Sequence, residues 1–244
     1  MTITIYKKRH KMKIVFVRHG HPNYADDCLT EKGILQAKAA AQRLKDEEIE
    51  VFFSSSCGRA RETCEIIAER HGKRESIVLL DFMREIGWGS YDKENDPIFE
   101  NGHPWRCANQ LVREGETIMR LDWEETLPLF NNNKVKEYAA AKGEEFDEFM
   151  SDLGYTREGD YYRVGTPKYK RIMIVSHAGS SSAVISHALN IPFPYFCHTF
   201  SPDLTSITVI NFHGEEGELI SPKVSMFGDA RHIAGIDCEK IISN

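Results

Sequence analysis

Two short, mostly apolar segments constrain the fold of this chain more than any other feature of its sequence. They cover residues 13–17 and 171–175, in which four apolar residues follow Lys13 and Arg171. The first is followed directly by Arg18 and His19, and His177 comes soon after the second. A strand that is apolar on both faces is typical of a parallel sheet covered by helices on both sides. Because reactive groups in such sheets lie beyond the carboxyl ends of the strands, we expect the two histidines to meet at one edge.

The segments around these two runs alternate between strand and helix. The apolar pattern predicts strands over residues 13–17, 51–53, 77–80, 171–175, 206–212 and 218–227, and helices from residue 30 to about 44, over 58–70 and over 180–189. Thr30 can cap the first helix. We therefore predict an α/β protein with three layers, helices on each side of a mostly parallel sheet.

The length of the chain and a change in its residue composition indicate one domain with an insertion. The 244 residues fit a single domain, 1–244. Residues 92–170 are more polar and aromatic, with helices predicted over 111–130 and 135–153, and we interpret this segment as a largely helical cap over the site. Residues 1–11 are interpreted as a basic extension outside the core.

Composition excludes several classes of protein. The formal net charge of −6 disfavours nucleic acid as a partner. No apolar run approaches the roughly 18–20 residues of a membrane span, and the N-terminus lacks the apolar region of a signal peptide. None of the six cysteines has CxxC spacing, which favours reduced thiols. We therefore expect a cytoplasmic protein without a membrane partner; the sequence leaves the oligomeric state open.

The residues at the predicted strand ends suit phosphoryl transfer. Guanidinium groups, as in Arg18 and Arg59, bind phosphate oxygens through paired donors. A neutral imidazole, as in His19, can attack phosphorus when its other nitrogen is held protonated. The departing oxygen then needs a proton, and Glu85 follows the predicted strand 77–80 closely enough to supply it.

These residues lie in segments that resemble the histidine phosphatase superfamily, the phosphoglycerate-mutase-like fold. Arg18-His19-Gly20 resembles its RHG signature; residues 29–37, 54–63, 84–92 and 176–179 resemble its LTxxGxxQA, SSxxxRAxxT, acid and second-histidine motifs. The resemblance implies that His19 is the nucleophile and forms a phosphohistidine. It implies that Arg18, Arg59 and His177 bind the phosphoryl oxygens, that Glu85 is the general acid and base, and that no metal or cofactor takes part.

Other residues compete for these roles. Arg61 is as basic as Arg59, and Asp81 and Asp92 flank Glu85, so only the motif register selects among them. A zinc site of His19, His21 and Cys28 is disfavoured, because the spacing lacks the paired ligands of common zinc sites.

The substrate contacts are less defined. His21 stands where the family often has Glu or Gln, and Tyr24-Ala25 stands where mutases have a Trp-Asn pair. Asn23 lies two residues early for that Asn. We take His21, Asn23 and His103 as candidate substrate-contacting residues.

Three functions fit the resemblance. We predict a phosphatase that hydrolyses a small phosphorylated metabolite, a phosphomonoester, through phosphohistidine. A phosphoglycerate-type phosphomutase is the alternative, disfavoured because residues 92–170 contain no adjacent arginines and no Pro-rich run. A non-catalytic phosphoester-binding module is the third, disfavoured because all five reactive groups are present.

Overall fold

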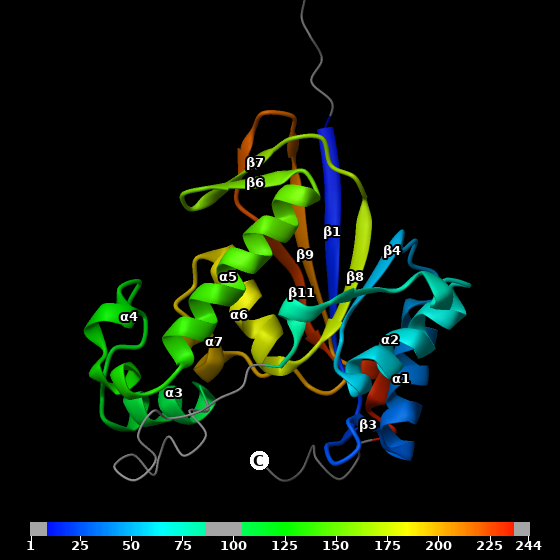
Figure 1. The fold of residues 1–244 in the computed structure, drawn as a ribbon, viewed down its shortest axis with the longest axis horizontal. Helices are drawn as coiled ribbons and strands as arrows, with labels where there is room; N and C mark the ends of the chain where they lie inside the picture. Colours follow the sequence, from blue (N-terminus) through cyan, green and yellow to red (C-terminus); the bar gives the residue numbers. More distant parts are fainter. Residues whose placement is uncertain (1–8, 86–103, 237–244) are drawn as a thin grey trace, which may run out of the picture.

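A computed structural model describes residues 9–85 and 104–236 of the chain (Figure 1). Its centre is a six-stranded sheet with the order β11-β9-β1-β8-β4-β5. The four parallel strands are β1 (Arg9–Arg18), β8 (Arg171–Ser176), β4 (Val51–Ser55) and β5 (Val78–Leu80). β9 (Ile207–Glu215) and β11 (Lys223–Asp229) add an antiparallel edge. The predicted α/β class with a mostly parallel sheet is confirmed.

The apolar strands fill two cores because alternate side chains point to opposite faces. On one face Val15 and Val17 pack with α1 (Glu31–Leu44) and α2 (Gly58–Arg70). On the other, Ile14 and Phe16 pack with α5 (Val135–Asp152) and α6 (Ala178–Leu189). The sheet therefore forms the middle of three layers (Figure 1).

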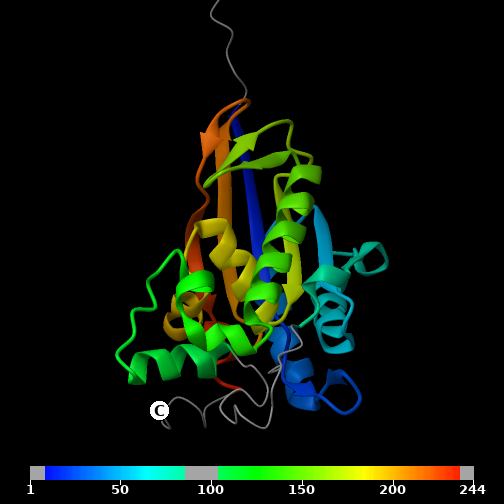
Figure 2. The ribbon, with the colours of Figure 1, turned by 60° about the vertical axis from the view of Figure 1, so that its left-hand side comes forward.

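Smaller elements complete the described chain. A second sheet joins β6 (Tyr155–Glu158), β7 (Tyr161–Val164) and β10 (Leu219–Ile220), and a two-stranded ribbon joins β2 (Pro22–Asn23) and β3 (Cys28–Leu29). The remaining helices are α3 (Pro104–Arg113), α4 (Trp123–Thr126), α7 (Phe193–Thr199) and the 3-10 turns η1 (Arg74–Ser76), η2 (Asp81–Met83), η4 (Pro128–Asn132) and η5 (Arg231–Ile233). Figures 1 and 2 place the β6–β7 hairpin at the opposite end of the main sheet from β3.

Several predicted boundaries differ from the structure. β1 begins at Arg9, because residues 9–11 pair with β9, so these three belong to the sheet and not to a terminal extension. The predicted helix over 111–130 is wrong: α3 ends at Arg113, Gly115 takes a positive φ of 75°, and α4 is a separate short helix. Thr30 caps α1 as predicted, its hydroxyl accepting from the amide of Gly33.

α5 belongs to the core of the main sheet. Its side chains Phe146 and Met150 share the cluster that contains Ile14 and Phe16. A separate cluster joins α3, α4 and α7, centred on Trp123, whose ring lies 5.0 Å from that of Phe130. The polar segment identified from the sequence thus packs in two different places. In the part of the chain that the structure describes, no helix is long and apolar enough to cross a membrane.

Candidate active site

The two strand-end histidines lie side by side because β1 and β8 are parallel neighbours. Arg18 is in register with Ser176, and the His19 amide donates to the Ser176 carbonyl at 2.9 Å. The rings of His19 and His177 are 5.0 Å apart between centroids, in an edge-to-face arrangement. Both side chains are almost fully buried, so their protonation depends on the groups around them.

His19 has the electronic state that a nucleophilic imidazole needs. Nδ1 lies 2.7 Å from the Gly20 carbonyl. A carbonyl can only accept, so Nδ1 holds the proton and Nε2 keeps its lone pair. Burial, reinforced by the charges of Arg18 and Arg59, lowers the pKa of His19 to about 3, although the Gly20 bond opposes the shift. The imidazole is therefore neutral at physiological pH.

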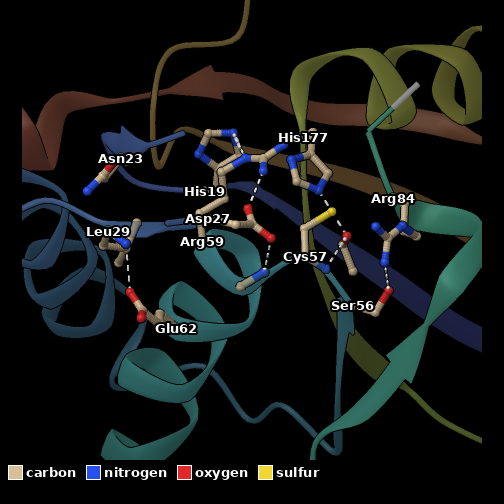
Figure 3. A network of polar contacts seen from close by, with 12 residues as sticks. His19, Asn23, Asp27, Leu29, Ser56, Cys57, Arg59, Glu62, Arg84 and His177 are labelled. Atoms are coloured by element: carbon tan, nitrogen blue, oxygen red, sulfur yellow. Dashed lines mark hydrogen bonds and ion pairs between the residues drawn. The ribbon is translucent and has the colours of Figure 1, made fainter. Parts of the chain in front are cut away.

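Arg59 directs its guanidinium at this lone pair. It lies in the first turn of α2, and its Nε is 3.4 Å from His19 Nε2 (Figure 3). On the other side Nη1 forms an ion pair with Asp27. Arg61 faces away, paired with Glu65 along the surface of the same helix.

Arg18 is held by the backbone that follows α7. Its Nη1 donates to the Pro202 carbonyl at 2.8 Å, and its buried Nε has no protein partner among the described residues. Burial lowers the pKa of this guanidinium, and the Glu85 carboxylate opposes that shift. A second cationic fork with an unused donor thus lies beside the imidazole pair.

His177 bonds to the end of β4. Its Nε2 is 2.9 Å from Ser55 Oγ, while its buried Nδ1 has no partner in the described chain. Burial, followed by the influence of His19, Arg59 and Arg18, lowers the pKa of His177 to about 2. A neutral imidazole can donate one hydrogen bond without adding charge to the site.

Glu85 reaches the site through the helix that follows His177. Its carboxylate accepts from the amides of Gly179, at 3.4 Å, and Ser180, at 3.1 Å, in the first turn of α6. The motif register thus selects a carboxylate that the fold brings to the start of α6, two and three residues after His177. Asp81 starts the η2 turn and is exposed; Asp92 lies outside the described residues.

Backbone contacts fix the loop after β1. The Gly20 amide donates to Thr63 Oγ1 at 3.1 Å, and that hydroxyl donates to the Arg59 carbonyl at 2.8 Å. A Cβ on Gly20 would meet the Gly33 carbonyl oxygen at 2.6 Å, so two glycines from separate motifs pack backbone to backbone. The loop that holds His19 is thereby tied to both α1 and α2.

The predicted substrate contacts have local partners. His21 Nδ1 lies 3.0 Å from Thr30 Oγ1 at the start of α1. Asn23 donates to Asp26 at 2.8 Å and accepts from the Ala25 amide at 3.1 Å. His103 lies outside the described residues. Within those residues no group of three metal-ligating side chains is close enough to hold an ion, so His19, His21 and Cys28 form no such cluster.

Sequence reasoning missed Asp27, Ser55 and Arg84. Ser55 ends β4 and touches His177; Arg84 precedes Glu85, and its Nη1 lies 3.2 Å from Ser56 Oγ (Figure 3). Ser55 and Arg84 lie within the motif segments 54–63 and 84–92, which was an available signal for both. Asp27 forms an ion pair with Arg59 from a loop that is distant in the sequence, and no local sequence pattern predicts that contact.

Comparison with known proteins places this site in context. The model of the histidine phosphatase superfamily (branch 1) matches residues 14–121 and 114–224. The chain is 34% identical over 191 residues to a probable phosphoglycerate mutase of Photorhabdus laumondii, covering 74% of this chain and 76% of that protein.

Two of the solved structures with a similar fold are phosphatases. A mutant phosphoserine phosphatase from Entamoeba histolytica, in complex with phosphoserine, superimposes with a TM-score of 0.59 at 20% identity, covering 91% of this chain and 99% of that one. A mycobacterial glucosyl-3-phosphoglycerate phosphatase gives 0.57 at 20% identity, over 90% and 99%. At this identity the likeness establishes the fold.

Proposed function

Because the chain belongs to branch 1 of the histidine phosphatase superfamily, we propose that it is a phosphatase that hydrolyses a small phosphomonoester through a phosphohistidine on His19. The observation that best supports this proposal is the neutral imidazole of His19. Its protonated Nδ1 is held by Gly20, and its Nε2 lone pair faces the Arg59 guanidinium. That is the arrangement of a nucleophile next to an oxyanion-binding group.

The reaction proceeds in two transfers. His19 Nε2 attacks phosphorus, the bond from phosphorus to the ester oxygen breaks, and Glu85 gives its proton to that oxygen as the alcohol leaves. Water then attacks the phosphohistidine, Glu85 takes the proton back from the water, and the nitrogen–phosphorus bond breaks to release phosphate. Arg18, Arg59 and the unused Nδ1 of His177 stabilise the charge on the phosphoryl oxygens in both steps.

A small substrate fits the charges around this site. Residues 92–170 contain 11 Lys and Arg against 17 Asp and Glu, which disfavours large polyanions. Of this segment, α3 lies in both ribbon views at the end of the molecule where the parallel strands finish (Figures 1 and 2). We take α3 as part of a cap that selects the leaving group, within a single domain; α5 packs in the core of the main sheet, and the β6–β7 hairpin lies at the other end of that sheet (Figure 1). The fold neighbours crystallised with phosphoserine and 3-phosphoglyceric acid support a substrate of this size.

Release of p-nitrophenol from p-nitrophenyl phosphate tests the activity. Wild-type protein should turn over, and His19→Ala should abolish turnover. Rapid acid-free quenching followed by intact-protein mass spectrometry should show one added phosphoryl group on the wild type and none on His19→Ala. Activity retained by His19→Ala would refute the nucleophile, and inactive wild type with bound phosphate would favour a binding module.

A phosphomutase is the second candidate, because the curated relative at 34% identity is named a probable phosphoglycerate mutase. A mutase keeps the phosphohistidine and returns the phosphoryl group to a second hydroxyl of the substrate. Interconversion of 2- and 3-phosphoglycerate, primed with 2,3-bisphosphoglycerate, should be negligible beside phosphate release. Mutase turnover faster than hydrolysis would reverse the order of the two proposals.

A further inference from the structure

Asp27 places a carboxylate against a cationic group of the phosphoryl site. It lies in the loop between β2 and β3, and its Oδ1 pairs with Arg59 Nη1 (Figure 3). Its Oδ2 accepts from the Gly58 amide at 2.7 Å, at the start of the same helix. The Arg59 side chain is 11% exposed and that of Asp27 45%, so the pair spans the boundary between the buried site and solvent.

This pairing decides which edge of the guanidinium faces the nucleophile. In arginine, Nε and Nη2 form one two-donor edge, and Nη1 lies away from it. Asp27 engages Nη1, and Nε faces His19 Nε2 at 3.4 Å. The edge turned toward the imidazole is thus the one that can bind two phosphoryl oxygens at once.

The loop is built to hold the carboxylate in this place. Asp27 has a positive φ of 49°, a conformation that Asp tolerates better than most residues. A Cβ on Gly58 would meet the Asp27 carbonyl oxygen at 2.1 Å, so the loop approaches α2 as closely as a glycine allows. Glu62, one turn further along α2, accepts from the Leu29 amide at 2.7 Å and anchors the loop's far end.

Simple electrostatics argues against a carboxylate at this position. A negative charge next to an anion-binding arginine weakens the attraction for phosphate. Burial raises the pKa of Asp27, but the hydrogen bonds from Gly58 and Arg59 outweigh burial and lower the pKa, so the carboxylate stays ionised. Any benefit of Asp27 to catalysis must therefore come from geometry, because the carboxylate fixes which edge of the Arg59 guanidinium faces the site.

We propose that Asp27 is a positioning residue that orients Arg59 for the phosphoryl group in the transition state. The inference rests on the proposed function, since it assumes that Arg59 binds the transferred phosphoryl. It predicts an effect opposite in sign to that of charge alone: neutralising Asp27 should weaken catalysis, not strengthen it.

A double-mutant cycle tests the assignment. Asp27→Asn keeps an acceptor for the Gly58 amide and removes the charge that holds Arg59. We expect kcat/KM for p-nitrophenyl phosphate, and the affinity for orthovanadate as a mimic of the transition state, to fall about tenfold or more. In an Arg59→Ala background the same substitution should change both by less than about twofold, because the group it positions is absent.

Two controls separate this role from charge and from loop anchoring. Asp26→Asn removes the neighbouring carboxylate, which bonds to Asn23 and not to Arg59, and should leave both quantities within about twofold of wild type. Glu62→Ala loosens the loop without touching Arg59, and should cost less than Asp27→Asn. Equal losses in the presence and absence of Arg59, tighter vanadate binding by Asp27→Asn, or a Glu62→Ala loss as large as that of Asp27→Asn would overturn the proposal.

Failure of the proposed function has a different signature. Wild-type protein without turnover refutes the phosphatase, while the vanadate arm of the cycle still decides whether Asp27 orients Arg59. Wild-type protein that neither turns over nor binds vanadate overturns both.

Discussion

Gly33→Ala is the substitution for which this structure predicts a reversal of the usual sign. In a helix, replacing Gly by Ala ordinarily stabilises by about 1 kcal/mol. Gly33 lies in the first turn of α1, where an added Cβ would meet the backbone oxygen of His21 at 2.3 Å. The obstacle is backbone, not the end of a flexible side chain, so neither segment can yield by a rotamer change.

The size of the effect follows from that distance. The two backbones must separate by about 0.7 Å before the contact reaches 3.0 Å, still closer than real Cβ contacts normally come. Forced overpacking typically costs about 1–3 kcal/mol, which offsets or exceeds the helix gain of about 1 kcal/mol and leaves a net loss of up to about 2 kcal/mol. His21 is two residues from His19, and shifts near 1 Å in a site can cost about 10²-fold. We expect kcat/KM to fall by roughly ten- to a hundredfold.

Urea denaturation measures the first effect and hydrolysis of p-nitrophenyl phosphate the second. Lys38→Ala, an exposed position on the same helix, is the control and should change neither by more than about 0.5 kcal/mol or twofold. A Gly33→Ala protein that is as stable and as active as wild type would refute the close packing of α1 on the loop that holds His19.

Three further outcomes are expected. Glu85→Gln should lower kcat/KM by about 10²–10⁴-fold for an alkyl phosphomonoester but far less for p-nitrophenyl phosphate, whose leaving group needs no proton; equal losses on both would exclude a general acid. Thr63→Val should lower the free energy of unfolding in urea by about 1–3 kcal/mol, because the buried Gly20 amide loses its acceptor, and an unchanged value would contradict that contact. Burial lowers the pKa of His19 to about 3, so the folded protein binds a proton at His19 less readily than the unfolded chain does. The contribution of His19 to the free energy of unfolding is therefore complete above pH 6.5. It is lost as the pH falls toward 3, by up to about 1.4 kcal/mol per pH unit. His19→Ala should therefore show a shallower acid slope than wild type in urea titrations, and identical slopes would count against a buried neutral imidazole.

The part of the site on the parallel strands could be predicted because strands that are apolar on both faces are typical of a parallel sheet covered by helices on both sides. Once residues 13–17 and 171–175 lie in one sheet, the histidines that follow them share an edge. The helix α1 could also be predicted from the sequence, since Thr30 caps it and its apolar positions repeat at helical spacing. In these segments the local pattern and the tertiary packing agree.

The segment after residue 104 could not be read in the same way. α3 and α4 bury their apolar side chains against α6 and α7, so their lengths depend on a tertiary cluster and not on local periodicity. The β6–β7 hairpin was missed although Gly159 supplies its turn, with a φ of 58°. Its Tyr162 packs edge-to-face on Phe212 of β9, a partner far along the chain.

The overall charge illustrates the same limit. The formal net charge of −6 suggests a protein that repels anions, yet the charges that act most strongly on His19 are those of Arg18 and Arg59. In a buried site, interactions over a few ångströms outweigh distant charges that solvent and salt screen. Asp27 differs from the other acidic residues counted in the net charge, because its carboxylate forms an ion pair with Arg59 and acts on that group directly. The value of kcat/KM and the affinity for orthovanadate should therefore fall with Asp27→Asn and stay within about twofold of wild type with Asp26→Asn, although the two substitutions change the net charge equally.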